Sequence, residues 1–356
     1  MKRLLILLVC SLFLGGCWDE KHYKDVTNVS LFGIEGEPGK IKAQFAYPIY
    51  EDGSISYSTI TGSGFTILDA KNNTNSMEGL DIAELQVMLI TEESAKSDLY
   101  KYLDALYRSP RNRLSAILAI VEGELAPYFE QHESLGSDMS SYYKELIDTA
   151  VRYTAVPEVD IQQVCRLLFE EDMSLALPYI KIGKESGTPI IGGTALFNKR
   201  EFTGEILDEK ESIHFNLLRK KLGRYARLSY MWKSGKEESP LTVDVISIDK
   251  DWDITDHKIN ASYKLKLTVE EYPHDNLDDK ETIKEVEDFL SKELTKDFTK
   301  VIKKLQEAKS DAVGFGRPVR AFHPKLWAKG EWNDTFSELP INVKVKTEIL
   351  RTGILN

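Results

Sequence analysis

The chain has 356 residues, of which 42% are hydrophobic and 29% are charged. This composition excludes collagen-like, coiled-coil-only and low-complexity classes, and the length suits about two domains that each bury a core. The formal net charge is −11, which repels phosphate backbones, and no dense basic patch offsets it, so we expect no nucleic acid partner.

The N-terminus has the pattern of an export signal. Lys2 and Arg3 are followed by the run 4–14, which is apolar except for Ser11. A helix that spans the hydrocarbon core of a bilayer needs about 20 apolar residues, so this run is too short. A cationic start, a short apolar segment and small residues before a cleavage point are typical of a secretory signal peptide.

Gly15 and Gly16 stand directly before Cys17, and this order resembles the bacterial lipobox. In a lipobox, the cysteine thiol is alkylated with diacylglycerol and the chain is cut just before it. We therefore expect a lipoprotein signal peptide at 1–16, a tether at 17–24, and Cys17 as the lipid attachment site, an S-diacylglycerol cysteine with N-palmitoylation left open. The alternative is an ordinary signal peptide with an accidental cysteine. Two acyl chains contribute roughly 20 kcal/mol of burial, so the protein would be anchored to a membrane without spanning it.

The remaining cysteines give no sign of a disulfide. Cys10 lies in the predicted signal peptide and Cys17 would be lipidated, which leaves only Cys165. Cys165 shares one face of a helical pattern with Ile161 and Leu168, so we expect it to be a small core residue rather than a reactive thiol.

Residues 25–190 are expected to form a mixed α/β domain, in which two subdomains remain an option. Strand-like patterns occur at 29–34, 40–47, 54–61, 83–90, 114–121 and 175–182. Helical patterns begin at 65 and 91 and recur at 140–151 and 160–171. Strand–helix–strand steps therefore recur. The glycine-rich stretch 183–193 is the best candidate for a boundary.

Residues 191–356 are expected to form a second domain with an antiparallel sheet. Short strands are predicted at 194–197 and 202–206, and longer alternating strands at 241–248, 258–269 and 340–350. A capping box at Asp208 and Glu211 opens a helix that reaches 222. The pattern over 279–309 predicts one long helix with a single apolar stripe, lying across the sheet. An exposed partner-binding helix is the rival interpretation. The predicted fold class is thus α+β, or mixed α/β, with two domains.

No catalytic, metal or cofactor site stands out in the sequence. The six histidines have no metal-binding spacing. Asp249, Asp251 and Asp253 lack the glycine and glutamate of a calcium loop, so we interpret them as a solvated turn between two strands. Ser141 and Lys144 match S-x-x-K, but its companion motifs are missing. We expect no enzyme activity.

Several segments resemble one known family when they are taken in order. They are Gly16-Cys17-Trp18-Asp19, Leu106-Tyr107-Arg108, Gly193-Thr194-Ala195-Leu196-Phe197 with Gly204, Asp311-Ala312-Val313-Gly314-Phe315-Gly316, Pro324-Lys325-Leu326-Trp327, Trp332 and Phe336. This pattern resembles the Ger(x)C family, the lipoprotein C subunits of GerA-type germinant receptors of endospore-forming bacteria. One departure is the acidic character of the residues just after Cys-Trp-Asp. Apart from the resemblance, we expect Gly314 and Gly316 to form a tight turn, and Trp327 and Trp332 to pack in the core.

The resemblance implies a non-enzymatic receptor subunit that is needed for nutrient-triggered spore germination. Its implied partners are membrane lipid through Cys17, a multi-pass A subunit and a transporter-like B subunit, at the outer face of the spore inner membrane. Two other functions remain open. A lipid-anchored solute-binding protein of a transporter predicts two similar α/β lobes with parallel sheets. A cell-surface hydrolase needs a nucleophile or a metal set, and the sequence shows neither.

Overall fold

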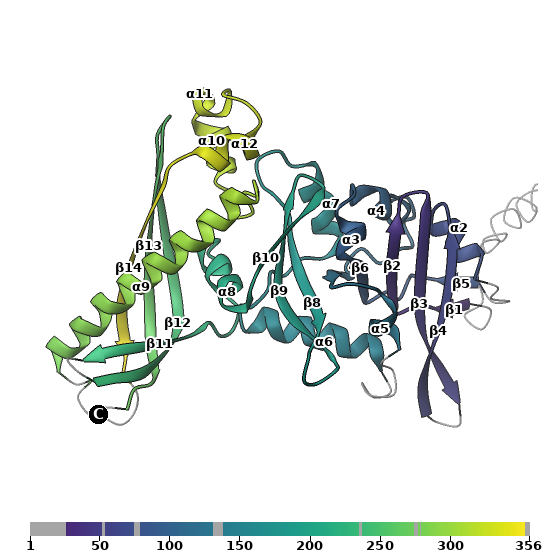
Figure 1. Ribbon diagram of the computed structural model, residues 1–356, viewed down its shortest axis with the longest axis horizontal. Helices are drawn as coiled ribbons and strands as arrows, with labels where there is room; N and C mark the ends of the chain where they lie inside the picture. Colours follow the sequence, from purple (N-terminus) through teal and green to yellow (C-terminus); the bar gives the residue numbers. More distant parts are fainter. Residues whose placement is uncertain are drawn as a thin grey trace, which may run out of the picture.

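The computed structural model describes residues 26–51, 54–74, 79–130, 138–234, 237–273, 277 and 279–352. These residues form an eight-stranded sheet, a four-stranded sheet and a two-stranded pairing. The two larger sheets follow one another along the long axis of the molecule, with α8 between them (Figure 1). The predicted mixed α/β class is confirmed.

The larger sheet has a parallel centre and antiparallel edges. Its strands, in spatial order, are β10 (Glu201–Leu207), β9 (Pro189–Asn198), β8 (Ala176–Ile182), β7 (Ile117–Val121), β6 (Val87–Thr91), β2 (Leu31–Glu37), β3 (Lys40–Glu51) and β4 (Ser54–Gly64). The pairs β2–β6, β6–β7 and β7–β8 are parallel, as expected where helices connect successive strands. The short strands β1 (Val26–Asn28) and β5 (Gly79–Asp81) pair separately.

Short helices connect these strands, and apolar side chains fill both faces of the sheet. The helices are α2 (Ile67–Asn72), α3 (Glu92–Ala95), α4 (Tyr100–Tyr107), α5 (Ala126–Phe129), α6 (Met139–Arg152) and α7 (Ile161–Phe169). The single helix predicted from residue 91 is broken into α3 and α4. Between the two helices, the backbone N–H of Leu99 donates to the carbonyl of Arg200 and not to a carbonyl of α3.

The strand β9 crosses residue 190, where the sequence placed the domain boundary. Both β9 and β10 pair within the larger sheet, although the sequence pattern predicts short strands of the second domain there. The division into domains at 25–190 and 191–356 stays a prediction.

The second half of the chain builds the four-stranded sheet and covers one face of it with a long helix. Its elements are α8 (Glu209–Leu218), β11 (Arg227–Ser234), β12 (Glu237–Ile254), β13 (Ile259–Glu271), α9 (Lys280–Glu307), α10 (Gly316–Phe322), α11 (Pro324–Trp327), α12 (Trp332–Glu338) and β14 (Ile341–Arg351). The predicted capping box is present at the start of α8.

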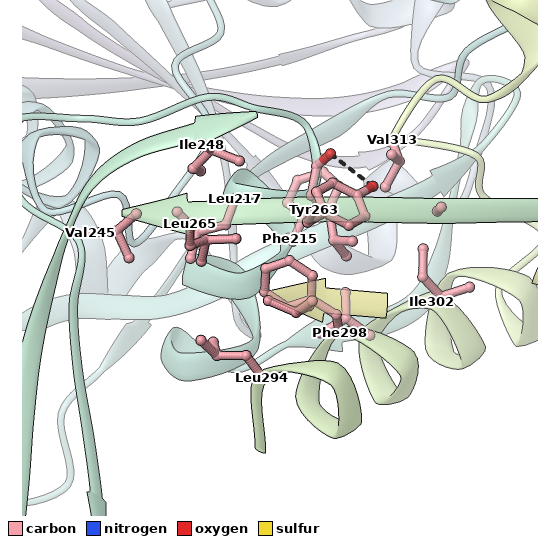
Figure 2. Close-up of a cluster of buried hydrophobic side chains, with 14 of the residues drawn as sticks. Phe215, Leu217, Val245, Ile248, Tyr263, Leu265, Leu294, Phe298, Ile302 and Val313 are labelled. Carbon is pink, nitrogen blue, oxygen red and sulfur yellow. Dashed lines mark hydrogen bonds between the residues drawn. The ribbon is translucent and has the colours of Figure 1, made fainter. Parts of the chain in front are cut away.

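The apolar stripe of α9 is buried against this sheet, as predicted, so the helix is not an exposed partner-binding element. Figure 2 shows Phe298 of α9 beside Tyr263 of β13, and their ring centroids are 5.4 Å apart. Glu211, the second residue of the capping box, also links α8 to α9, because its carboxylate forms ion pairs with Lys300 at 2.9 Å and Lys304 at 2.6 Å.

The expectation of a purely antiparallel sheet is wrong at its last strand. The pairs β11–β12 and β12–β13 are antiparallel, but β14 runs parallel to β13. The reason is the 28-residue helix α9, which returns the chain along the sheet before β14 begins. The alternation of buried and exposed residues in β14 arises because α9 covers only one face.

The predicted turn at Asp249, Asp251 and Asp253 is also wrong. All three residues lie on β12, which continues to Ile254, and their partners on β13 include Lys264 and Asn260. The carboxylates occupy the exposed face of the strand, while Ile248, the residue before Asp249, is buried. The three acidic residues therefore occupy the exposed positions of a strand whose sheet is covered on only one face.

Candidate functional site

Cys17, the predicted lipid attachment site, lies outside the described residues. The predicted signal peptide at 1–16 and the tether at 17–24 lie outside them as well. The assignment of Cys17 stays a prediction from the sequence.

In the part of the chain that the structure describes, no helix is long and apolar enough to cross a membrane. The same residues contain no group of three or more His, Cys, Asp or Glu side chains placed to hold a metal ion. Ser141 and Lys144, the S-x-x-K pair, lie on α6 and interact there with Asp138 and Asp148. Cys165 is a free, partly buried thiol on α7.

A buried carboxylate organises the segment after α9. The Asp311 side chain accepts hydrogen bonds from the backbone N–H groups of Gly314, Phe315 and Gly316 at 2.8, 3.1 and 2.7 Å, and from the Trp332 indole N–H at 2.7 Å. Burial raises the pKa of Asp311, while these four hydrogen bonds favour its charged form. The predicted tight turn and the packing of Trp332 are confirmed, and Trp327 stacks on Trp332 at 5.8 Å.

We call residues 309–340 the closing segment; it connects the two sheets. The backbone N–H of Ser174 donates to the carbonyl of Asp311 at 2.9 Å, and Asn333 bonds to both Ser174 and Asn198. A side chain at Gly316 would place its Cβ 2.4 Å from the carbonyl oxygen of Asp172. The glycine therefore permits the close approach of the closing segment to the first half of the chain.

An open cleft of about 860 Å³ lies beside these contacts, between α7, the β9–β10 turn and the closing segment. Each cation of its lining has an acidic partner: Lys199 contacts Glu331 at 2.9 Å, and Lys309 contacts Asp334 at 2.7 Å. Arg200 lies 3.7 Å from Asp98. The lining holds six acids against these three cations, so the cleft is polar and carries an excess of negative charge.

A second pocket, of about 600 Å³, lies between α7, the end of α8, β12 and the start of α10. We call it the basic pocket because its lining contains more cations than acids. The cations are Arg166, Arg219, Lys221, Lys250 and Arg317, and the acid is Glu158. Sequence reasoning missed this pocket, since its residues come from distant parts of the chain.

A third polar group is buried between α8, α9 and β11. His214 is 2% exposed and lies 3.6 Å from Asp297, while the Tyr230 hydroxyl donates to the same carboxylate at 2.9 Å. Burial lowers the pKa of His214, although Asp297 acts in the opposite direction. The imidazole is therefore neutral at pH 7.

This neutral histidine predicts a loss of stability in mild acid. The unfolded chain takes up a proton near pH 6.5 and the folded chain at lower pH, so the free energy of unfolding falls as pH drops below about 6.5. One proton gives a slope of at most about 1.4 kcal/mol per pH unit. Urea denaturation at pH 7, 6 and 5 should show a smaller fall for His214→Gln than for wild type. His257→Gln, at an exposed histidine, is the control, and equal slopes in all three proteins would contradict the assignment.

Comparison with known proteins places both halves of the chain in one family. Residues 19–182 match the family described as "Spore germination protein N-terminal domain", and residues 192–353 match "Spore germination B3/GerAC like, C-terminal". "Spore germination protein GerQC" of Bacillus cereus is 24% identical, over 99% of this chain and 99% of that protein. "Spore germination protein KC" of Bacillus subtilis (strain 168) is 24% identical, over 99% and 96% of the two chains.

A solved structure, the crystal structure of the GerBC protein, has the same fold. Its TM-score is 0.56 at 16% sequence identity, and the match covers 90% of this chain and 97% of that chain. The two family matches follow one another along the sequence and leave out few residues. The chain belongs to the Ger(x)C family of spore germination proteins.

Proposed function

We propose that this chain is a non-enzymatic, lipid-anchored C subunit of a germinant receptor, needed for nutrient-triggered spore germination. The observation that carries the proposal is the full-length match to proteins named as spore germination proteins. Lipidation of Cys17 would hold the subunit at the outer face of the spore inner membrane, with a multi-pass A subunit and a transporter-like B subunit. Anchoring also raises the effective concentration of the subunit near these partners, so modest interfaces suffice.

The fold favours this proposal over a solute-binding protein. That alternative predicts two similar lobes with parallel sheets. The two larger sheets of the described residues are instead unlike, and only the eight-stranded one has helices connecting a run of parallel strands. The hydrolase alternative gains no support from Ser141 and Lys144, because both side chains bond to acids on or at the start of their own helix.

Germination assays test the proposal directly. We expect spores that lack the protein, and spores with Cys17→Ala, to lose the response to one nutrient while a receptor-independent trigger still works. Loss of optical density measures germination, and membrane fractionation should find the Cys17→Ala protein outside the membrane fraction. Cys165→Ala is the matched control, since it removes a cysteine that the proposal leaves without a role.

Paralogous receptors could supply the same response, so the deletion is repeated in a strain without them. Normal nutrient germination in that strain would overturn the proposed function and make solute binding the leading alternative. A defect in the deletion strain but not with Cys17→Ala would keep the receptor role and remove the requirement for the anchor.

A further inference from the structure

Two cations of the basic pocket lie close together without an acidic partner. Arg219 follows the end of α8 with its guanidinium 5.1 Å from the Phe215 ring centroid, and Lys250 on β12 has its ammonium 3.9 Å from that of Trp252. Neither side chain forms an ion pair with an acid among the described residues, although both line the pocket. Aromatic rings attract cations but do not neutralise them.

The pKa values of both cations are lowered by their surroundings. Burial, and then the charges of Arg219 and Lys220, lower the pKa of Lys250 to about 8. Burial, and then Arg317, lower the pKa of Arg219 to about 10. Both groups remain charged at pH 7, so the folded chain holds partly desolvated like charges near one another.

The neighbouring acids relieve this repulsion only in part, since the charge of Asp311 acts to raise the pKa of Lys250 but does not outweigh the burial and the cations that lower it. Glu170 forms ion pairs with Arg166 and Arg317, and the carboxylate of Asp311 already accepts four hydrogen bonds. Glu158 and Lys221 line the pocket as well, and both are exposed. The chain as a whole is acidic, with a net charge of −11, so this local excess of cations runs against its composition.

Asn216 supplies a second, independent observation. Its side chain is 2% exposed and lines the basic pocket. The amide Nδ2 donates to the carbonyl of Thr154 at 2.8 Å, which fixes the orientation, while Oδ1 is buried without a hydrogen-bond partner. A buried acceptor of this kind costs free energy unless a donor reaches it.

The shape of the pocket suits a small molecule. Its volume of about 600 Å³ lies within the range of small-molecule sites, which commonly occur between domains. Apolar side chains form part of the lining, among them Val156, Leu167 and Met173.

We propose that the basic pocket binds a small organic oxyanion, bearing a carboxylate or phosphate group and a hydroxyl or amino group. The oxyanion lies between Arg219 and Lys250, and the donor group reaches Oδ1 of Asn216 once the side chains that cover this buried atom move aside. The apolar lining contacts the carbon skeleton of the ligand.

Thermal denaturation and titration calorimetry of the full chain in mild detergent test this proposal. The probes are inorganic phosphate, glycerol 3-phosphate and malate, with glycerol as the uncharged control. We expect a saturable rise in Tm with an oxyanion and none with glycerol. Glycerol 3-phosphate or malate should bind more tightly than phosphate, because each carries a hydroxyl for Asn216.

Variants locate the site. Arg219→Gln or Lys250→Gln should weaken binding at least tenfold, since a charged hydrogen bond is lost. Arg224→Gln is the matched control, because Arg224 also lies over an aromatic ring, that of Tyr225 at 5.3 Å, but is exposed and outside the pocket. Without ligand, Arg219→Gln and Lys250→Gln should be at least as stable as wild type. If these two cations served only to stabilise the fold, each substitution would lower the stability instead.

Three outcomes would overturn the proposal. One is the lack of any saturable response to the oxyanions, and another is equal binding by wild type and by Arg219→Gln and Lys250→Gln. The third is binding of a hexaglutamate peptide where no small oxyanion binds, which would make the pocket a protein docking site. None of these outcomes bears on the germination role, which is tested without the pocket variants.

Discussion

Asp311→Ala is expected to lower the free energy of unfolding by about 4 kcal/mol or more. The substitution leaves three backbone N–H groups and the Trp332 indole N–H buried without an acceptor. Each unsatisfied buried group costs about 1–3 kcal/mol, and breaking a buried charged network costs about 3–5 kcal/mol. Since the carbonyl of Asp311 also accepts from Ser174, disorder in this turn would loosen the contact between the two halves of the chain.

Urea denaturation of matched variants measures this effect. Asp311→Asn keeps the size of the side chain and one accepting oxygen, but its NH₂ group faces donors. Its loss of unfolding free energy should therefore be measurable, and smaller than that of Asp311→Ala. Asp334→Ala removes an exposed aspartate of the closing segment that pairs only at the surface with Lys309, and it should change stability little. Similar midpoints for Asp311→Ala and Asp334→Ala would show that the buried network contributes nothing.

The elements that the sequence predicts best are those with one apolar face. The stripe of α9 and the alternation of β14 were each visible as a simple period, and both are buried on the side that the period indicates. The capping box of α8 is local in the same sense, because Asp208 and Glu211 satisfy each other within one turn. Such features depend only on neighbours along the chain.

Pairing between distant strands could not be predicted in this way. The same alternation in β14 fits a parallel or an antiparallel neighbour, and only the path of α9 decides between them. Similarly, β9 begins within the glycine-rich stretch that predicts a boundary, and β10 follows it, yet both strands extend the first sheet. The strand β11 was missed altogether.

The candidate site shows the same limit. The sequence drew attention to the segment 311–316 and to Trp332, but it did not predict that the Asp311 carboxylate accepts hydrogen bonds from Gly316 and from the distant Trp332. The basic pocket gave no sequence signal, since Arg219 and Lys250 lie on different elements and neither belongs to a recognised motif. An excess of cations without acidic partners can be recognised only in the folded structure, which shows which charges lie near one another.

Gly193→Ala is expected to destabilise the protein by about 2–5 kcal/mol, which explains the glycine of the Gly-Thr-Ala-Leu-Phe segment. Gly193 has a φ of +130°, a conformation that side chains rarely adopt. A Cβ there would lie 1.9 Å from the carbonyl oxygen of Leu207, which belongs to the paired strand β10. The estimate combines about 1–2 kcal/mol of backbone strain with about 1–3 kcal/mol of overpacking, and the backbone contact cannot be relieved by a rotamer change.

Gly204→Ala separates the two contributions. Gly204 also has a positive φ, +86°, but a Cβ there would meet no atom within 4 Å. Alanine at this position should therefore cost only the backbone strain, about 1–2 kcal/mol. Urea midpoints of the two variants measure the difference, and equal losses would mean that the β9–β10 pairing yields to admit the methyl group. A larger loss of stability for Gly193→Ala would show that β9 and β10 can approach each other this closely only because residue 193 has no side chain. This approach lies where the first sheet adjoins α8.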